Sequence, residues 1–347
     1  MRDGLETRVS EGDADTEGLQ GDIAPPGEIV VDPWTGYVPV DISSFSKLVV
    51  PNFDIYIPVR GRPVLYSEAG TGPAGWQVIR RLRDRGHGTV YIHSSQREVY
   101  LDHIQEYLEE VLSDRSADGN KLASVLYSGT TNLVQKIFEE TVTGQAIQRA
   151  QDIVSTIVDN IYNWKDILPS VVGLVSHHYY TYTHSVNVAV FSIALAQHMG
   201  ISEMAFLKEL GLGGLLHDLG KRRIDRSILD KPGPLSNSEW SLVRQHPAWG
   251  KDLSCDVAHL GDVSRRAILE HHERCDGSGY PEGASRADIS LEGRIIAVAD
   301  VYSALSSKRA YKDAARPFRA LEMMKGEMKG AFDPEVFREF VLLLGGA

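Results

Sequence analysis

A change of pattern near residue 120 constrains the fold of this 347-residue chain more than any other feature. Before it, short apolar segments separated by turn residues alternate with two helical patterns. After it, apolar residues recur at helical spacing to the C-terminus, and no strand-like alternation of comparable strength appears. The sequence therefore predicts an α+β protein with two domains, a small N-terminal α/β domain followed by an all-α helical bundle.

Composition sets the predicted domain limits. Residues 1–33 are acidic and lack periodic apolar character, which predicts a disordered tail. We expect the α/β domain at 34–113, a polar linker at 114–120 and the helical domain at 121–347. The predicted strands are 48–50, 55–59, 63–66 and 88–92, and the predicted helices are 76–85, 97–112, 120–140, 143–163, 165–177, 184–199, 202–220, 236–246, 262–273, 291–305, 316–329 and 334–344.

Three helix ends can be read directly. Ser236 with Glu239 is a capping-box pair, and Asp333 before Pro334 is typical of a helix start. Gly200 follows an apolar helical stretch and is typical of a left-handed C-terminal cap.

Charge and cysteine content exclude several classes of protein. A net charge of −11 argues against a DNA or RNA polymer as partner. The two cysteines, Cys255 and Cys275, provide no disulfide framework and suit a reducing compartment. No apolar run reaches the ~20 residues needed to cross a bilayer, and the N-terminus lacks a signal-peptide pattern. We therefore expect a cytoplasmic protein that does not use a membrane.

The histidines concentrate in the helical domain. His87, His93 and His103 precede it without carboxylates at ligand spacing, so we expect them to be exposed or hydrogen-bonded. The others are His177, His178, His184, His198, His217, His246, His259, His271 and His272.

His217-Asp218 is a polar pair inside an apolar helical pattern, where burial without partners is costly. Metal coordination satisfies both side chains, and a carboxylate can bridge two cations. A buried hydrogen-bonded couple is the alternative. Lys221 follows His217 by four residues and is expected on the same helical face, which weakens that alternative.

Three further residues extend this pattern. His184 opens an apolar helix, His246 is expected to close the helix that begins after Ser236, and Asp300 is an isolated carboxylate in an apolar helix. Each can equally be a satisfied core residue or face solvent. Imidazole and carboxylate together suit Fe, Mn, Ni, Co or Zn, and the lack of thiolates argues against a structural zinc finger.

The stretch 271–281 joins two adjacent histidines to a Gly-rich turn that ends in Tyr280-Pro281. Adjacent side chains on a helix point about 100° apart, so both histidines reach one metal only at a helix end or in a wide cluster. Glycines let the backbone approach a ligand closely. The alternative is a helix with two surface histidines that ends in a loop.

Two sequence blocks carry a family resemblance. His217-Asp218 with Gly220-Lys221, and His271-His272-Glu273 followed by Asp276-Gly277-Ser278-Gly279-Tyr280-Pro281, resemble the HD-GYP family of metal-dependent phosphohydrolases. The resemblance spans roughly residues 120–347. It implies an all-α bundle that hydrolyses cyclic di-GMP to linear pGpG or onward to GMP.

The resemblance also implies the roles of individual residues. Asp218 is expected to bridge two metals, and Lys221 to help protonate the leaving group. Gly279, Tyr280 and Pro281 are expected near the substrate, and Arg309 and Lys312 to hold its phosphates. The implied metal ligands are His184, His217, Asp218, His246, His271, His272 and Asp300, with His271 and His272 sharing a metal with Asp218 and His246.

Departures from the family pattern refine these expectations. Some members have a glutamate four residues before the first histidine ligand, and it supports a third metal. Tyr180 stands there in this chain, which predicts two divalent ions, with iron or manganese favoured over nickel, cobalt or zinc. Lys308 and Ala310 replace the usual Asp and Pro, a change that bears on substrate affinity.

Other functions stay open at this stage. The chain can be a cyclic di-GMP receptor or scaffold with little turnover, or a phosphohydrolase of another cyclic nucleotide or a nucleoside monophosphate. The N-terminal domain is expected to be regulatory, with a partner or ligand that the sequence does not identify. The apolar stripe of the helices at 120–165 fits a homodimer seam and internal packing equally well.

Overall fold

The structure is a computed structural model that describes residues 33–45, 51–70, 73–113, 119–139, 144–163, 183–255, 260–306 and 317–345. Nearly all of the predicted acidic tail lies outside these ranges, as do the predicted strand at 48–50 and the predicted helix at 165–177.

The N-terminal part is a four-stranded antiparallel sheet with two helices. Its strand order is β1-β4-β2-β3. The elements are β1 (Tyr37–Asp41), β2 (Ile55–Val59), β3 (Arg62–Ser67), α1 (Pro73–Asp84), β4 (Thr89–His93) and α2 (Arg97–Ser113), with short 3-10 turns η1 (Ile42–Ser44) and η2 (Ser94–Gln96). The order of strands and helices after residue 55 agrees with the prediction, within one to three residues at most ends.

Strand β1 was absent from the prediction. Pro39 interrupts its pattern and lacks an N–H for the ladder. The structure accommodates this proline because β1 is an edge strand that pairs only with β4, in register Val38 to Ile92. Val38 and Val40 alternate into the core with 1% exposure each.

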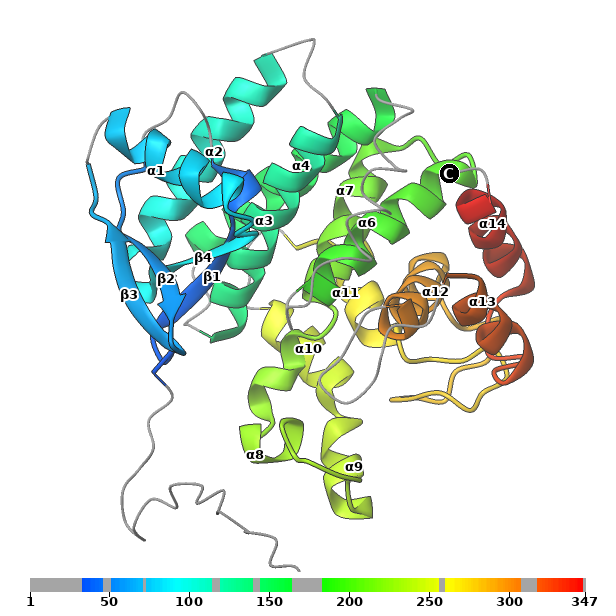
Figure 1. Ribbon diagram of the computed structural model, residues 1–347. Helices are drawn as coiled ribbons and strands as arrows, with labels where there is room; N and C mark the ends of the chain where they lie inside the picture. The colour runs from blue at the N-terminus through cyan, green and yellow to red at the C-terminus, as the bar shows by residue number, and fades with distance from the viewer. Residues whose placement is uncertain are drawn as a thin grey trace, which may run out of the picture.

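The remainder of the described chain is helical (Figure 1). Its elements are α3 (Gly119–Glu139), α4 (Gly144–Asn163), α6 (Thr183–His198), α7 (Met204–Leu216), η3 (Leu219–Arg223), α8 (Arg226–Leu229), α9 (Asn237–Val243), α10 (His246–Cys255), α11 (Asp262–Glu270), α12 (Leu291–Ser306), α13 (Pro317–Gly326) and α14 (Pro334–Gly345). Helix α3 packs against α2, β1 and η1 on one side and against α4 and α6 on the other, so one apolar core runs through both parts. Within the described ranges no helix has the length and apolarity to cross a membrane.

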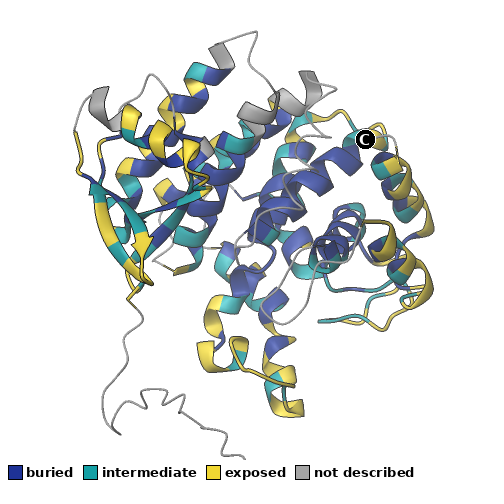
Figure 2. Cartoon of the chain, in the orientation of Figure 1, coloured by how far each residue is buried: buried dark blue, intermediate teal, exposed yellow. Residues whose placement is uncertain are grey.

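Helices α6, α7 and α12 form the interior of the helical part, and Figure 2 shows them almost entirely buried, whereas α8 and α9 are largely exposed. All three predicted caps are confirmed. Ser236 and Glu239 exchange both capping-box hydrogen bonds, and Asp333 accepts the N–H groups of the first turn of α14. Gly200 adopts a φ of 87° after α6.

Two predicted boundaries were wrong. The helix expected at 202–220 ends at Leu216 and gives way to η3, so His217 and Lys221 do not share one helical face. His246 does not close the helix that follows Ser236, because α9 ends at Val243 and His246 begins a separate helix, α10. Helix α3 begins at Gly119, one residue before the predicted helix at 120–140.

Candidate metal centre

His217 and Asp218 lie where helix α7 breaks, and glycines determine what the break packs against. A Cβ on Gly214 would lie 2.7 Å from Ala189 Cα in α6, and one on Gly213 would lie 2.6 Å from Ala267 Cβ in α11. A Cβ on Gly220 would collide with the carbonyl oxygen of His246. These close approaches hold α6, α11 and the start of α10 around the break.

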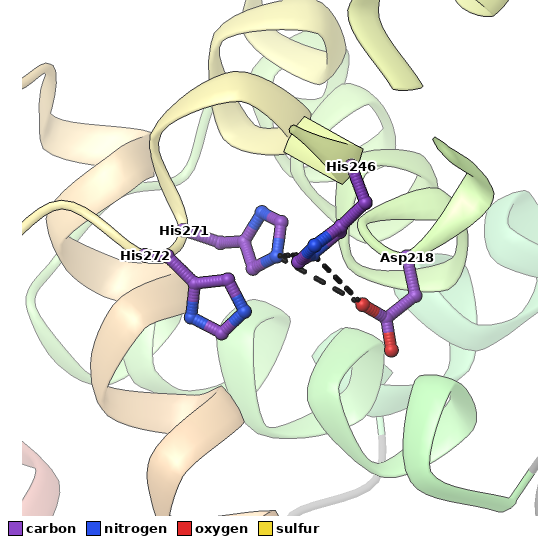
Figure 3. Close-up of side chains that lie close together, drawn as sticks. All are labelled: Asp218, His246, His271 and His272. Atoms are coloured by element: carbon purple, nitrogen blue, oxygen red, sulfur yellow. Dashed lines mark hydrogen bonds and ion pairs between the residues drawn. The ribbon is translucent and has the colours of Figure 1, made fainter. Parts of the chain in front are cut away.

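The structure gathers all seven expected ligand residues into two adjacent groups. One group is Asp218, His246, His271 and His272, and the other is His184, His217 and Asp300. In each group the candidate ligand atoms lie within 4.8 Å of one another. Figure 3 shows the first group, in which His246 and His271 converge on Asp218. His271 terminates α11, so the adjacent histidines do stand at a helix end.

Both carboxylates face both groups. Asp218 Oδ1 is 3.3 Å from His246 Nε2, while its Oδ2 is 3.4 Å from His217 Nε2. Asp300 Oδ1 is 3.0 Å from His184 Nε2, while its Oδ2 is 3.7 Å from His272 Nδ1. Two oxygens on one carboxylate can bind two cations, so either aspartate can bridge a pair of metals.

Backbone carbonyls fix the orientation of three imidazoles. Nδ1 of His217, His246 and His271 lies 2.8, 2.7 and 2.8 Å from the carbonyl oxygen of the third residue before it. A carbonyl only accepts, so each Nδ1 carries the proton and the Nε2 lone pair of the neutral ring faces the centre. Metal-binding histidines use this arrangement.

The same hydrogen bonds leave buried lone pairs that a cation would satisfy. Nε2 of His246 lies 3.1 Å from Nε2 of His271, and two lone pairs at that distance repel each other. His217 Nε2 and Asp218 Oδ1 are buried and have no hydrogen-bond partner within the described part of the chain. Unsatisfied buried polar atoms are costly, so this set of donors fits divalent metal.

The protonation states of most candidate ligands favour cation binding. Burial would raise the pKa of Asp218, but Lys221 and His217 outweigh it and hold that pKa well below its usual value. Burial lowers the pKa of His271, and it lowers the pKa of His272 to about 3. His217 is the exception, because burial would lower its pKa but Asp218 and Asp300 together with the carbonyl of Gly214 raise it. Ionised carboxylates and neutral imidazoles are the forms that bind metals.

Lys221 reaches the centre by a different route from the one expected. Its Nζ donates to Asp218 Oδ2 at 2.6 Å from the 3-10 turn η3. Its side chain is about one-third exposed, so the ammonium lies between the candidate ligands and solvent.

The loop at 279–281 folds back onto the first group. The N–H of Tyr280 donates to the carbonyl oxygen of His272 at 3.2 Å, and a Cβ on Gly279 would lie 2.5 Å from Glu273 Cα. The Tyr280 ring centroid is 4.7 Å from that of His272 and 6.3 Å from that of His246. The expected substrate loop therefore lies against candidate metal ligands.

Sequence reasoning named Glu273 only as part of a motif and missed what it does. Its carboxylate, 2% exposed, accepts the N–H groups of Glu282 at 2.7 Å and Ala284 at 2.9 Å. Both donors follow Tyr280-Pro281, so Glu273 ties the far end of the loop to the residue next to His272. The available signal was its position, directly after His271-His272 and before the Gly-rich turn.

Several expected residues lie outside the described residues. These are Arg309 and Lys312, together with Lys308, Ala310 and Tyr180.

Comparisons with known proteins cover the segment that carries this site. Residues 168–336 match a family model described as HD domain. A "Cyclic di-GMP phosphodiesterase PA4108" from Pseudomonas aeruginosa is 40% identical over 225 residues, which cover 64% of this chain and 54% of that protein. A "3'3'-cGAMP-specific phosphodiesterase 3" from Vibrio cholerae is 39% identical over 158 residues, which cover 46% of this chain and 34% of that protein.

A solved structure matches nearly the whole fold. It is described as "Bd1817, a HDG"Y"P protein from Bdellovibrio bacteriovorus", with a TM-score of 0.68 and 22% identity, and the match covers 89% of this chain and 100% of that one. The chain spans about half the length, or less, of the curated relatives above. Residues 168–336 therefore carry an HD domain, and the His-Asp pair at 217–218 with the Gly-Tyr-Pro loop at 279–281 resembles the pattern of the HD-GYP branch.

Proposed function

We propose that this chain is a metal-dependent phosphodiesterase that hydrolyses cyclic di-GMP to linear pGpG, and onward to GMP, at a centre of two divalent metal ions. The observation that carries the proposal is the pair of carboxylates, Asp218 and Asp300, each facing both groups of histidines. The name of the relative from Pseudomonas aeruginosa supports cyclic di-GMP as the substrate.

The seven gathered residues would hold the two ions. Two ions bound there would supply Lewis acidity toward phosphoryl oxygens and activate a water as nucleophile. One group offers three imidazoles and one carboxylate, and the other offers two imidazoles and one carboxylate. This ligand set has no thiolate and favours iron or manganese, with nickel, cobalt or zinc as further options.

The chain's own residues would orient the substrate and handle the proton. Lys221, which is partly exposed and donates to Asp218, would protonate the leaving oxygen. The loop of Gly279, Tyr280 and Pro281 would face the substrate beside His272. Arg309 and Lys312 are proposed to hold its phosphates.

The N-terminal part is proposed to regulate the helical part through α3. One face of α3 contacts β1 and η1, and on the other face Tyr127 donates to Asn187 of α6 at 3.0 Å. Helix α6 carries His184, so a shift of α3 would reach the second group. The same proposal includes a homodimer and a regulatory partner or ligand that binds the N-terminal part.

A second candidate substrate is 3'3'-cGAMP, favoured by the name of the Vibrio cholerae relative. The test is a turnover assay with metal-loaded protein, purified anaerobically, on cyclic di-GMP, 3'3'-cGAMP and a nucleoside monophosphate. Cyclic di-GMP should be cleaved with the highest kcat/KM. Tight binding of cyclic di-GMP without cleavage would instead make the protein a receptor, and preferential cleavage of 3'3'-cGAMP would reassign the substrate.

A further inference from the structure

Arg244 places a guanidinium group at the edge of the candidate metal centre. It caps the C-terminal end of α9, two residues before His246. Its Cζ lies 5.7 Å from the ring centroid of Tyr280. The Tyr280 ring in turn lies beside His272 and His246, so the guanidinium is separated from the metal centre by one aromatic ring.

The donors of Arg244 are not used within the described part of the chain, where no carboxylate pairs with its exposed side chain. Nearby cations are engaged differently. Lys221 donates to Asp218, and Arg274 donates to the carbonyl oxygens of His271 and Glu273. Arg244 is therefore a cation at the rim of the site with its N–H groups available for an anion.

The surroundings of Arg244 keep its guanidinium in a position to bind an anion. Its backbone lies in the turn between α9 and α10, next to Val243, whose carbonyl oxygen orients His246. Its guanidinium lies over an aromatic ring whose backbone is tied to His272, and a cation within about 6 Å of a ring centroid is attracted to its face. Arginine stacked on an aromatic face still offers in-plane N–H donors that match phosphate geometry.

We propose that Arg244 binds a phosphate oxygen of the cyclic dinucleotide, with Tyr280 supporting the guanidinium. This inference rests on the proposed function. It makes Arg244 a substrate-binding residue on the segment that carries His246, separate in sequence from Arg309 and Lys312. A substrate large enough to extend past the Tyr280 ring would contact Arg244, whereas a small diester held at the metals would not reach Arg244.

The experiment compares Arg244→Ala and Arg244→Lys with the wild-type protein on two substrates. These are cyclic di-GMP and bis(p-nitrophenyl) phosphate, with metal content measured on the same samples. Arg80→Ala is the matched control, since Arg80 is an exposed arginine on α1 whose side chain is 75% accessible. Loss of a charge-assisted hydrogen bond should lower kcat/KM for cyclic di-GMP roughly 10- to 100-fold, mainly through KM.

The two substrates separate a binding role from a structural one. The loss caused by Arg244→Ala should be roughly tenfold larger for cyclic di-GMP than for the small diester, and Arg244→Lys should recover only part of it because lysine lacks the planar fork. Equal losses on both substrates, or no loss on cyclic di-GMP, would overturn the inference. A wild-type protein that leaves cyclic di-GMP intact would instead overturn the proposed function, and that outcome is seen before any variant is compared.

Discussion

His103 in the N-terminal part and His271 in the helical part are both buried, at 4% and 0% exposure, but their surroundings differ. Neither ring nitrogen of His103 has a hydrogen-bond partner in the described structure, and its ring packs against Phe45 and Phe53. In His271, Nδ1 is held by the carbonyl oxygen of Ile268 and Nε2 faces a second imidazole and a carboxylate. Burial is common to both, and only the second arrangement can bind a cation.

The orientation of the imidazoles, rather than their burial, distinguishes the candidate metal centre from the N-terminal core. The His103 ring fills space in an aromatic cluster, and burying both ring nitrogens without hydrogen bonds costs stability. In the helical part, carbonyls turn the lone pairs of several imidazoles toward the same two carboxylates. The earlier expectation that His103 would be exposed or hydrogen-bonded was therefore wrong, because aromatic packing rather than a polar partner decides its position.

Asp218→Ala should have the largest effect, on both turnover and metal content, because it removes a carboxylate toward which the imidazoles of the helical part point. Both groups lose a shared ligand, which removes several kcal/mol of transition-state stabilisation and lowers kcat roughly a thousandfold or more. Steady-state turnover of cyclic di-GMP and metal content by mass spectrometry measure it. Asp252→Ala is the control, since Asp252 is an exposed carboxylate on α10. A variant at Asp218 with wild-type activity would mean that the carboxylate does not bridge.

Gly214→Ala should damage the framework of the centre. The added Cβ would lie 2.7 Å from Ala189 Cα, which is backbone and cannot move aside cheaply. We expect a destabilisation of about 1–3 kcal/mol, as for other overpacked cores. Thermal unfolding measures it against Gly326→Ala, where an added Cβ meets nothing within 4 Å. Equal melting temperatures for the two variants would show that α6 and α7 do not need the close approach.

His103→Phe should stabilise the protein at acid pH. Burial lowers the pKa of His103 to about 4. The unfolded residue has a pKa of about 6.5 and takes up a proton first, so stability falls as the pH drops from about 6.5 toward about 4. Phenylalanine removes this loss, about 2 kcal/mol at pH 5. Unfolding curves at pH 7 and pH 5 test it, and an unchanged pH dependence would contradict the buried, neutral state.

Glu273→Gln should have an effect confined to substrate binding. The amide presents an NH₂ group to one of the loop N–H donors and so loses one hydrogen bond, about 1–3 kcal/mol. We expect KM for cyclic di-GMP to rise roughly tenfold, while the metal content stays that of the wild type. Glu282→Gln, at an exposed position, is the control. A fall in metal content with unchanged KM would place Glu273 in the metal centre rather than in the loop.

The sequence predicted the helical part well where periodicity and caps agree. Helices α3, α4, α6 and α12 begin and end within about one residue of their predicted limits, and the ends at Ser236 and Asp333 follow from local hydrogen bonds that their residue types dictate. The ligand residues were expected from the family resemblance, and the structure places all seven in two adjacent groups.

What the sequence missed depends on tertiary packing. The apolar pattern continues through Leu219, so nothing local ends α7 at Leu216; the contact between Gly220 and the carbonyl oxygen of His246 requires the break. Pro247 was a usable signal that His246 starts a helix, since proline favours the first turn. The contacts of Arg244 and Glu273 with the loop join segments that periodicity cannot align.

The two adjacent groups of ligands imply that seven side chains form one centre for two metal ions. Inductively coupled plasma mass spectrometry on anaerobically purified protein, beside the His217→Ala and Asp218→Ala variants, tests it most directly. We expect close to two divalent ions per chain in the wild-type protein and a clear loss in both variants. A wild-type protein that binds no divalent metal after loading, or variants that keep the full wild-type content, would contradict it.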